Sequence, residues 1–285
     1  MPIVAEKLEY TYLPGTPFEH KAVSDVNFTI EDGEFVGIIG HTGSGKSTLV
    51  QILSRLILPT SGRVLIDGVD YAPKKADRKQ LRRKVGVVFQ YPEYQLFEET
   101  VEKDIAFGPR RAGIPEEEIP SCVDAAMELV GLDPDTYRDK SPFELSGGQK
   151  RKVAIAGVLA MRPSILIMDE PIAGLDPMGR ESLMELVRRL NSEGMTILMV
   201  SHNMDGLAEY ASRILVMEKG RLILNGTPRE VFSHSEQLRA AGLDLPEAAQ
   251  LAEQLRLRGV PVPEGLIRFD EVRDFIIEWK GGAAK

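Results

Sequence analysis

The chain has 285 residues and a formal net charge of -8, a length that suits one large domain with or without a small appendage. Its hydrophobic content of 43% is ordinary for a globular protein, and no apolar run approaches the roughly eighteen residues that a membrane span needs. The acidic balance argues against broad binding to nucleic acid, and the single Cys122 excludes an intrachain disulfide, which suits a reducing compartment.

The first part of the chain, residues 3–38, predicts a set of antiparallel strands. Residues 8–12 and 22–30 alternate between apolar and polar side chains and are separated by a Pro-Gly turn. Tyr12 ends the first of these strands, where its ring could stack on a nucleotide base or pack against a neighbouring strand. Tyr10 is the second candidate for the same contact.

A glycine-rich loop follows an apolar run at 35–39 and leads into a helical pattern at 49–53. It has the form G-x-x-x-x-G-K-[ST], which turns several backbone N–H groups around a polyphosphate at the positive end of a helix dipole. We expect Lys46 to reach the β- and γ-phosphates of a nucleotide such as ATP, and the Ser47 hydroxyl to ligate Mg²⁺. The predicted phosphate-binding residues are Gly40, His41, Thr42, Gly43, Ser44, Gly45, Lys46, Ser47 and Thr48.

Two features precede the middle of the chain. The basic run at 74–84 predicts a helix with a solvated charged face, or a contact with anionic lipid or a partner. The buried strand predicted at 85–89 ends at Gln90. A polar residue at the carboxyl end of a parallel strand lies where α/β sheets bind ligands, so Gln90 could contact Mg²⁺ or the attacking water, or simply lie at the surface.

The segment 91–143 predicts a helical insertion into the α/β domain, and Leu145 begins a second glycine motif that leads into a helix at 150–161. Two glycines after a serine at a helix N-terminus form another anion cradle. Because one triphosphate does not need two cradles in one chain, we expect this motif to cover a nucleotide held by another chain. Its residues are Ser146, Gly147, Gly148 and Gln149.

Polar side chains end two further predicted strands. The apolar strand at 164–168 leads into Asp169 and Glu170, and the strand at 195–201 leads into His202. Since parallel strands end at a common sheet edge, we expect these groups to meet at the phosphate loop. Asp169 would hold Mg²⁺ through water, Glu170 would orient or deprotonate the attacking water, and His202 would contact the γ-phosphate.

The C-terminal part changes character after Gly220. It predicts a strand at 221–224, a helix starting at 227–232, and amphipathic helices at 247–258 and 270–280. The last helix carries an apolar stripe that either packs on its own domain or contacts a second chain. We therefore predict a main domain at residues 1–232 and a helical accessory domain at 233–285.

In this order the motifs resemble those of an ATP-binding cassette (ABC) ATPase across residues 3–232. The resemblance implies an α/β fold, the ABC cassette of the P-loop NTPases, in which a RecA-like core sheet carries an antiparallel β subdomain and an inserted α-helical subdomain. The small C-terminal helical domain resembles one thought to help such ATPases pair. The resemblance also implies ATP hydrolysis with Mg²⁺ and places Asp176, in the Ala-Gly-Leu-Asp segment, beside the nucleotide.

Segments 12–19, 90–97 and 104–109 are similar to the ATPases of energy-coupling factor transporters, which take up vitamins or, in one branch, cobalt and nickel ions. The form of 91–97 is closer to the second ATPase subunit of the vitamin-type module. The resemblance implies head-to-tail closure of two cassettes, with this chain pairing with itself or with a sister ATPase. It also implies a transmembrane coupling subunit docked near Gln90, a substrate-binding membrane subunit beyond it, and a location on the cytoplasmic face of the cell membrane.

Other cassette proteins are alternatives. Translation-type proteins carry two cassettes in a chain, and repair-type proteins insert a long coiled coil, whereas this chain has one cassette and 91–143 shows no heptads. An ATPase of a conventional importer that uses a separate substrate-binding protein remains the alternative, with the C-terminal tail as a regulatory domain.

Overall fold

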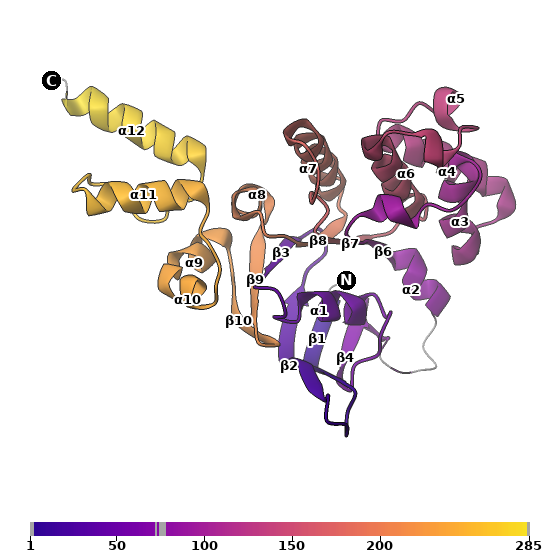
Figure 1. Cartoon of the computed structure of the whole chain (residues 1–285), viewed down its shortest axis with the longest axis horizontal. Helices are drawn as coiled ribbons and strands as arrows, with labels where there is room; N and C mark the ends of the chain where they lie inside the picture. The colour runs from indigo at the N-terminus through magenta and orange to yellow at the C-terminus, as the bar shows by residue number, and fades with distance from the viewer. Residues whose placement is uncertain (1–2, 72, 74–77, 284–285) are drawn as a thin grey trace.

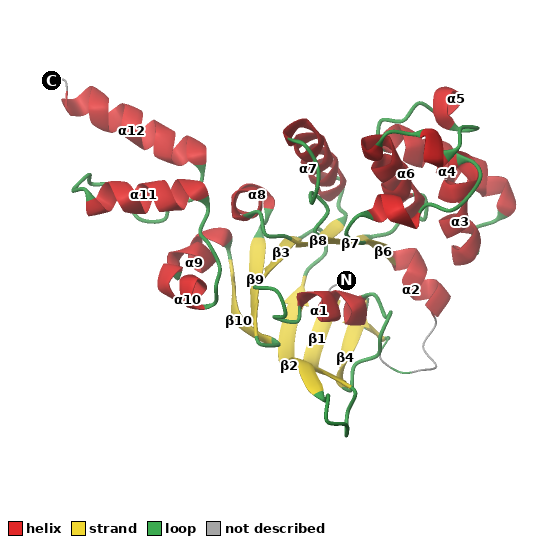
Figure 2. Ribbon diagram, viewed as in Figure 1, coloured by secondary structure: helices red, strands yellow, loops and turns green. Residues whose placement is uncertain are grey.

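The computed structural model describes residues 3–71, 73 and 78–283, and the strands among them form two sheets. A four-stranded antiparallel sheet has the order β2-β1-β4-β5, and a six-stranded sheet has the order β10-β9-β3-β8-β7-β6. Figures 1 and 2 show one group of helices beyond the β6 edge of the larger sheet and the C-terminal helices beyond its β10 edge. Residues 74–77 of the predicted basic helix lie outside the described residues, and its remainder forms α2 (Arg78–Lys84).

The larger sheet has five parallel strands and an antiparallel edge strand, β10. Alternate residues of a strand face opposite layers: Leu166 and Met168 join the core under helices α7 and α8, whereas Ile165 and Ile167 join the core around helix α1. Burial on both faces explains why these strands are apolar throughout. The elements are β3 (Phe35–Ile39), β6 (Val85–Val88), β7 (Ile165–Asp169), β8 (Thr196–Val200), β9 (Arg213–Glu218), β10 (Arg221–Gly226), α7 (Pro177–Ser192) and α8 (Met204–Tyr210).

Two strand predictions need correction. The prediction of antiparallel strands over 3–38 is wrong for β3, which pairs in parallel with β8 and β9. The turn before β3 does not close a hairpin, because it is tied to the larger sheet: the Gly33 N–H donates to Thr196 Oγ1 (2.9 Å) and the Asn191 side chain donates to the Gly33 carbonyl (2.9 Å). Strand β9 was not predicted, although its run Ile214 to Met217 is fully buried.

The antiparallel sheet covers the other side of α1 (Lys46–Leu53). Leu49, Ile52 and Leu53 of this helix are buried in one core with side chains from both sheets. The start of α1, which follows the glycine-rich loop, is therefore held between the two sheets. The strands are β1 (Ile3–Tyr12), β2 (His20–Ile30), β4 (Ser61–Ile66) and β5 (Val69–Asp70).

The helical insertion packs as one layer against the main core. Ile105, Val123, Met127 and Val153 lie in the same buried cluster, so the helix that follows the second glycine motif packs with those before it. We therefore propose that the insertion extends past residue 143 to the end of α6. Its elements are α3 (Val101–Ala112), α4 (Ile119–Leu129), α5 (Pro134–Tyr137) and α6 (Gly147–Leu159), with short 3-10 turns η1 (Pro92–Gln95), η2 (Glu116–Glu118) and η3 (Pro142–Glu144).

The C-terminal helices divide between two cores. Phe232 and Leu238 join the main core, whereas Ala252 and Val272 form a small separate cluster. We therefore propose that the accessory unit begins near Pro246. The helices are α9 (Pro228–Ser233), α10 (Ser235–Ala240), α11 (Glu247–Leu257) and α12 (Phe269–Ala283).

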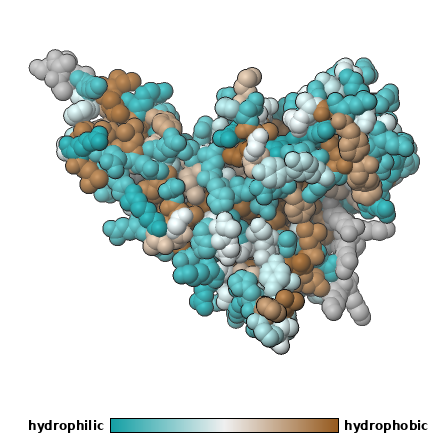
Figure 3. Space-filling view, in the orientation of Figure 1, coloured by the Kyte–Doolittle hydropathy of each residue, from teal (hydrophilic) through white to brown (hydrophobic). Residues whose placement is uncertain are grey.

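The accessory unit keeps an apolar surface. Figure 3 shows apolar side chains gathered over α11 and α12, where Leu251, Leu257, Phe269, Ile277 and Trp279 are exposed. Of the predicted stripe on the last helix, Val272 is buried and Trp279 is not. No helix in the described part of the chain is both long and apolar enough to cross a membrane.

Candidate active site

The glycine-rich loop connects β3 to α1 and leaves its first helical N–H groups without a side-chain cap. Gly45, the residue before α1, has φ +102°, and a Cβ there would lie 2.3 Å from the Ala22 carbonyl oxygen. Only glycine fits this approach and this conformation. The uncapped N–H groups at the helix start therefore point into a cradle for an anion.

Lys46 is the cation of this loop. Its buried Nζ donates to the carbonyl oxygens of Gly40 (2.5 Å) and His41 (3.1 Å), so the chain's own carbonyls hold it beside the loop. Burial lowers the pKa of Lys46, and the nearby carboxylates of Glu170 and Asp169 act in the opposite direction. A charged phosphate would satisfy this cation better than neutral carbonyls do.

Asp169 ends β7 next to the loop. Burial raises the pKa of its carboxyl, while Lys46, a hydrogen bond from the Ser47 hydroxyl and the nearby His202 lower it. The strand order places β8 between β3 and β7, and Asp169 pairs with Val200 of β8. Ser47, in the first turn of α1 after β3, and Asp169, at the end of β7, therefore come from neighbouring parts of this sheet edge, and both carry oxygen ligands of the kind that Mg²⁺ prefers.

Glu170 has a strained backbone and an unpaired carboxylate oxygen. Its φ of +49° is rare for a residue with a Cβ and costs about 1–2 kcal/mol. Its N–H donates to the Val200 carbonyl (3.0 Å), which holds this conformation. Oε1 lies 3.3 Å from Nε2 of His202, but it is buried without a hydrogen-bond partner. An orphaned carboxylate oxygen beside a phosphate cradle can accept a hydrogen bond from a water molecule.

Tyr12 also reaches the loop. Its hydroxyl lies 3.2 Å from Thr48 Oγ1, at the start of α1, and its ring packs edge-to-face on Tyr10 with centroids 4.7 Å apart. Tyr10 packs against the core cluster around α1, whereas Tyr12 is 37% exposed. Tyr12 thus packs against an aromatic neighbour in the sheet and is also partly exposed beside the loop, where a nucleotide base could stack on it.

Three other predicted site residues or motifs form no hydrogen bond with this cluster among the described residues. Gln90 is exposed at the end of the edge strand β6, and among the described residues no hydrogen bond joins it or the second glycine motif to the phosphate loop. Ser146 and Gln149 instead form a capping box at the start of α6, and the Gln149 side chain donates to the Tyr137 hydroxyl (3.0 Å). Asp176 is exposed and caps α7 through the Gly179 N–H (2.8 Å).

A protein-family model described as "ABC transporter" matches residues 23–173, more than half of the chain. The matched region contains the phosphate loop, the second glycine motif and the acidic end of β7.

The chain belongs to the ABC transporter ATPase family.

Curated relatives place this ABC ATPase among the energy-coupling factor transporter ATP-binding proteins and favour that class over conventional importers. It is 53% identical to "Energy-coupling factor transporter ATP-binding protein EcfA2" of Clostridium perfringens (strain 13 / Type A) over 279 residues, 98% of each chain. The protein of the same name from Clostridium acetobutylicum is 57% identical over 252 residues, 88% of each chain. The resemblance inferred from the motifs is confirmed.

Solved structures confirm the predicted cassette fold. The structure of cbiO1 from Clostridium perfringens, described as part of the ABC transporter complex cbiONQ, has 41% identity and a TM-score of 0.72, covering 88% of this chain and 98% of that one. A dimeric post-hydrolysis state of the ATP-binding cassette MJ0796, bound to ADP and Pi, has 30% identity and a TM-score of 0.69, covering 79% and 98%. This ABC ATPase therefore binds and hydrolyses ATP.

The raised pKa of Glu170 predicts an unusual pH dependence of stability. Burial, the largest cause, raises this pKa above the ordinary value of 4.5, so the folded cassette holds the proton to higher pH than the unfolded chain does. The protonated Glu170 side chain therefore increases the free energy of unfolding fully below pH 4.5, and this contribution is lost as pH rises through the pKa that Glu170 has in the folded protein. We expect Glu170→Gln, without nucleotide, to melt at a higher temperature than the wild type at pH 7, with the difference shrinking towards pH 4.5.

Thermal denaturation at several pH values checks this expectation, with the exposed Glu116→Gln as the control that should change little. A melting-temperature difference that grows on acidification would contradict it.

Proposed function

We propose that this chain is the ATP-hydrolysing subunit of an energy-coupling factor importer that powers uptake of vitamins or transition-metal ions. The observation that carries the proposal is the buried Lys46 held by the Gly40 and His41 carbonyls of the glycine-rich loop, with Glu170 Oε1 buried beside His202 and without a hydrogen-bond partner. The names of the relatives, which extend over nearly the whole chain, support the transporter class.

Mg²⁺ fits this site as a shared ligand of protein and phosphate. In the part of the chain that the structure describes, no group of three His, Cys, Asp or Glu side chains could hold a metal alone. Mg²⁺ commonly binds one or two carboxylates together with substrate phosphates and water. Ser47, Asp169 and, after rearrangement of its exposed loop, Gln90 would hold it, and the ion would neutralise charge on the β- and γ-phosphates.

The hydrolytic roles follow from position. Glu170 accepts a proton from the attacking water, since its Oε1 is buried, lies beside His202 and has no hydrogen-bond partner. His202 is half-exposed beside it and contacts the γ-phosphate through a ring nitrogen. Lys46 and the loop N–H groups bind the phosphates, and the exposed face of Tyr12 stacks on the base.

The separation of the two glycine motifs supports head-to-tail pairing. The N–H groups at the start of α6 lie on the insertion and reach no phosphate loop in their own chain, so the nucleotide is completed by an opposed chain. Ser146, Gly147, Gly148 and Gln149, with Asp176 nearby, would face the partner's ATP. The partner is a sister ATPase or a second copy, and the exposed apolar side chains of α11 and α12 would help to hold the pair.

The segment after Gln90 supports docking to a membrane protein. Tyr94 is 83% exposed and Phe97 is 56% exposed, so two aromatic side chains stand ready for burial against a partner. We propose that a transmembrane coupling subunit binds here, connects the ATPase to a substrate-binding membrane subunit, and holds it at the cytoplasmic face of the cell membrane.

The test is transport by the assembled complex. The chain is coexpressed with the membrane subunits and sister ATPase encoded in its genome, reconstituted into vesicles, and supplied with ATP and a panel of labelled vitamins, Co²⁺ and Ni²⁺. We expect ATP-dependent uptake of a panel member without any soluble substrate-binding protein, and none with Glu170→Gln. Uptake that requires an added soluble binding protein would favour the conventional importer instead.

A further inference from the structure

A buried ion pair joins the insertion to the segment after Gln90. Arg151 lies in the second turn of α6 with its side chain only 5% exposed. Its Nε and Nη2 donate to the two carboxylate oxygens of Glu93 in η1, both at 2.9 Å. Two parallel bonds hold a guanidinium and a carboxylate in one mutual orientation.

The same guanidinium reaches the turn that begins at Glu170. Its Nη1 donates to the carbonyl oxygens of Ala173 (2.9 Å) and Pro171 (3.3 Å). The Glu170 carbonyl in turn accepts from the Ala173 N–H (3.1 Å), which closes a tight turn immediately after the strained residue. Arg151 therefore fixes the backbone from which the Glu170 carboxylate extends.

A second contact joins the same two segments independently. Gly174 has φ +74°, and a Cβ there would lie only 3.3 Å from Cε1 of Tyr91, so the aromatic ring packs on this turn. Tyr91 itself has φ +54°, a conformation that a residue with a Cβ keeps only when its surroundings hold it.

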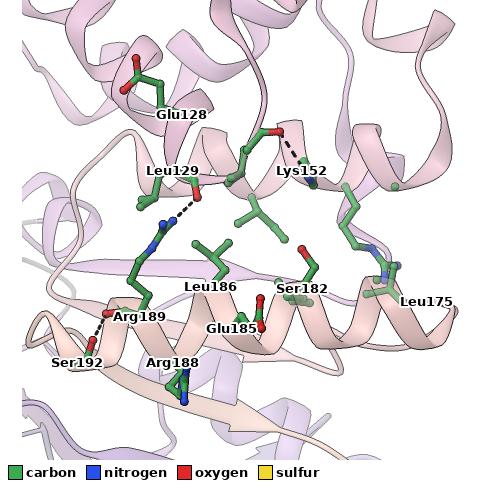
Figure 4. Close-up of a pocket in the computed structure, with 17 residues that line it drawn as sticks. Glu128, Leu129, Lys152, Leu175, Ser182, Glu185, Leu186, Arg188, Arg189 and Ser192 are labelled. Atoms are coloured by element: carbon green, nitrogen blue, oxygen red, sulfur yellow. Dashed lines mark hydrogen bonds between the residues drawn. The ribbon is translucent and has the colours of Figure 1, made fainter.

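A groove separates part of the insertion from helix α7. The groove has a volume of about 910 Å³ and lies between α4 and α6 on one side and α7 on the other (Figure 4). Lys152, Ser182 and Leu186 are among the residues that line it. Arg189 of α7 bridges it by donating to the Leu129 carbonyl (2.5 Å). Arg151 and Leu175 also line this groove, so the contact between α6 and the turn after Glu170 forms part of its wall.

We propose that Arg151, held by Glu93, is a positioning residue that sets the turn carrying Glu170 for ATP hydrolysis. Because Glu93 and Tyr91 belong to the segment that exposes Tyr94, movement of that segment on docking is transmitted through the pair to Glu170. The inference rests on the proposed function, in which Glu170 activates water.

The test compares two pairs of the same chemistry. Glu93→Gln removes the charge of the buried pair, while Glu116→Gln does the same to the exposed, forked Arg110–Glu116 pair. ATP turnover is measured in the assembly that hydrolyses ATP. Since small misplacement of a positioned group can cost up to about a hundredfold in rate, we expect Glu93→Gln to lower kcat about tenfold or more with KM for ATP unchanged. Glu116→Gln should leave both unchanged.

A purely structural role gives a different result. It predicts a lower melting temperature for Glu93→Gln with a wild-type kcat per folded molecule, and that outcome overturns the proposal. Arg151→Lys should also lower kcat, because a single ammonium group cannot reproduce the fork and the two carbonyl contacts. Full activity of Arg151→Lys would show that charge alone suffices and would equally overturn it.

If Glu93→Gln does not fold, Tyr91→Asn decides the matter. Asn tolerates a positive φ, so this exposed substitution removes the ring from Gly174 without new backbone strain. If Tyr91→Asn lowers kcat at constant KM, even by less than the tenfold expected for Glu93→Gln, the link between this segment and the turn at Glu170 is supported. A wild-type kcat overturns it. If Glu170 does not activate water, Glu170→Gln hydrolyses ATP at the wild-type rate. That result is distinct from a failure of the Arg151 proposal alone.

Discussion

Glu170→Gln is expected to lower ATP turnover by at least about a hundredfold while the protein still binds ATP, because general base catalysis contributes about 10²–10⁴ in rate. Glutamine keeps the size of the side chain and its contact with His202, but it cannot take a proton from water. The buried, unpaired Oε1 of Glu170 is the atom whose basicity is lost. Single-turnover phosphate release measures the rate, and titration with a fluorescent ATP analogue measures binding. The matched Glu116→Gln should behave as the wild type. Hydrolysis at the wild-type rate in Glu170→Gln would contradict the role of Glu170 as the general base.

The same variant reveals how the cassettes pair. Light scattering of purified Glu170→Gln with and without Mg-ATP gives its mass in solution. A shift to dimer on adding ATP would show that two copies complete the nucleotide sites. Dimer in both conditions would point to the exposed apolar face of α11 and α12 as the contact that holds the pair. Monomer throughout, despite ATP binding, would require a sister ATPase to supply the opposing glycine motif.

Lys46→Met is expected to weaken ATP binding by about tenfold to about 150-fold, since one hydrogen bond to a charged group contributes about 1.5–3 kcal/mol. Methionine fills a similar volume without the cation that lies inside the loop beside the Gly40 carbonyl. Calorimetric titration with Mg-ATP measures the affinity. Lys103→Met removes an exposed lysine on α3 as the control and should leave affinity unchanged. Equal affinities of Lys46→Met and wild type would contradict the phosphate role.

The same titration separates the two tyrosines. Tyr12→Ala should weaken binding about threefold to tenfold, the range expected for an aromatic contact worth about 0.5–1.5 kcal/mol. Tyr10→Ala should mainly lower the melting temperature, because Tyr10 packs against the core around α1. A larger loss of affinity in Tyr10→Ala than in Tyr12→Ala would reverse this assignment.

Local chemistry explains which parts of the fold were predictable. The phosphate loop, with glycines at positions that a Cβ would block, requires a strand before it and a helix after it, and β3 and α1 stand there. Continuous apolar runs predicted β7 and β8, because strands covered on both faces have no polar side. The apolar run that forms β9 carries the same signal, so this strand is also predictable from the sequence. The sheet to which β3 belongs carried no local signal, since a turn at Gly33 is compatible with a hairpin or a crossover.

The sequence by itself determined the family of this protein and predicted its site chemistry: a phosphate loop, two carboxylates, a histidine and a second glycine motif in the order of one family. The tertiary structure alone decided which of these groups meet. The strand order β3-β8-β7 joins Ser47 to Asp169, while the second motif lies on a separate helical layer. The tertiary structure also revealed the ion pair of Arg151 with Glu93, which lie 58 positions apart in the sequence. Such contacts depend on strand order and packing between distant segments, which local residue patterns do not encode.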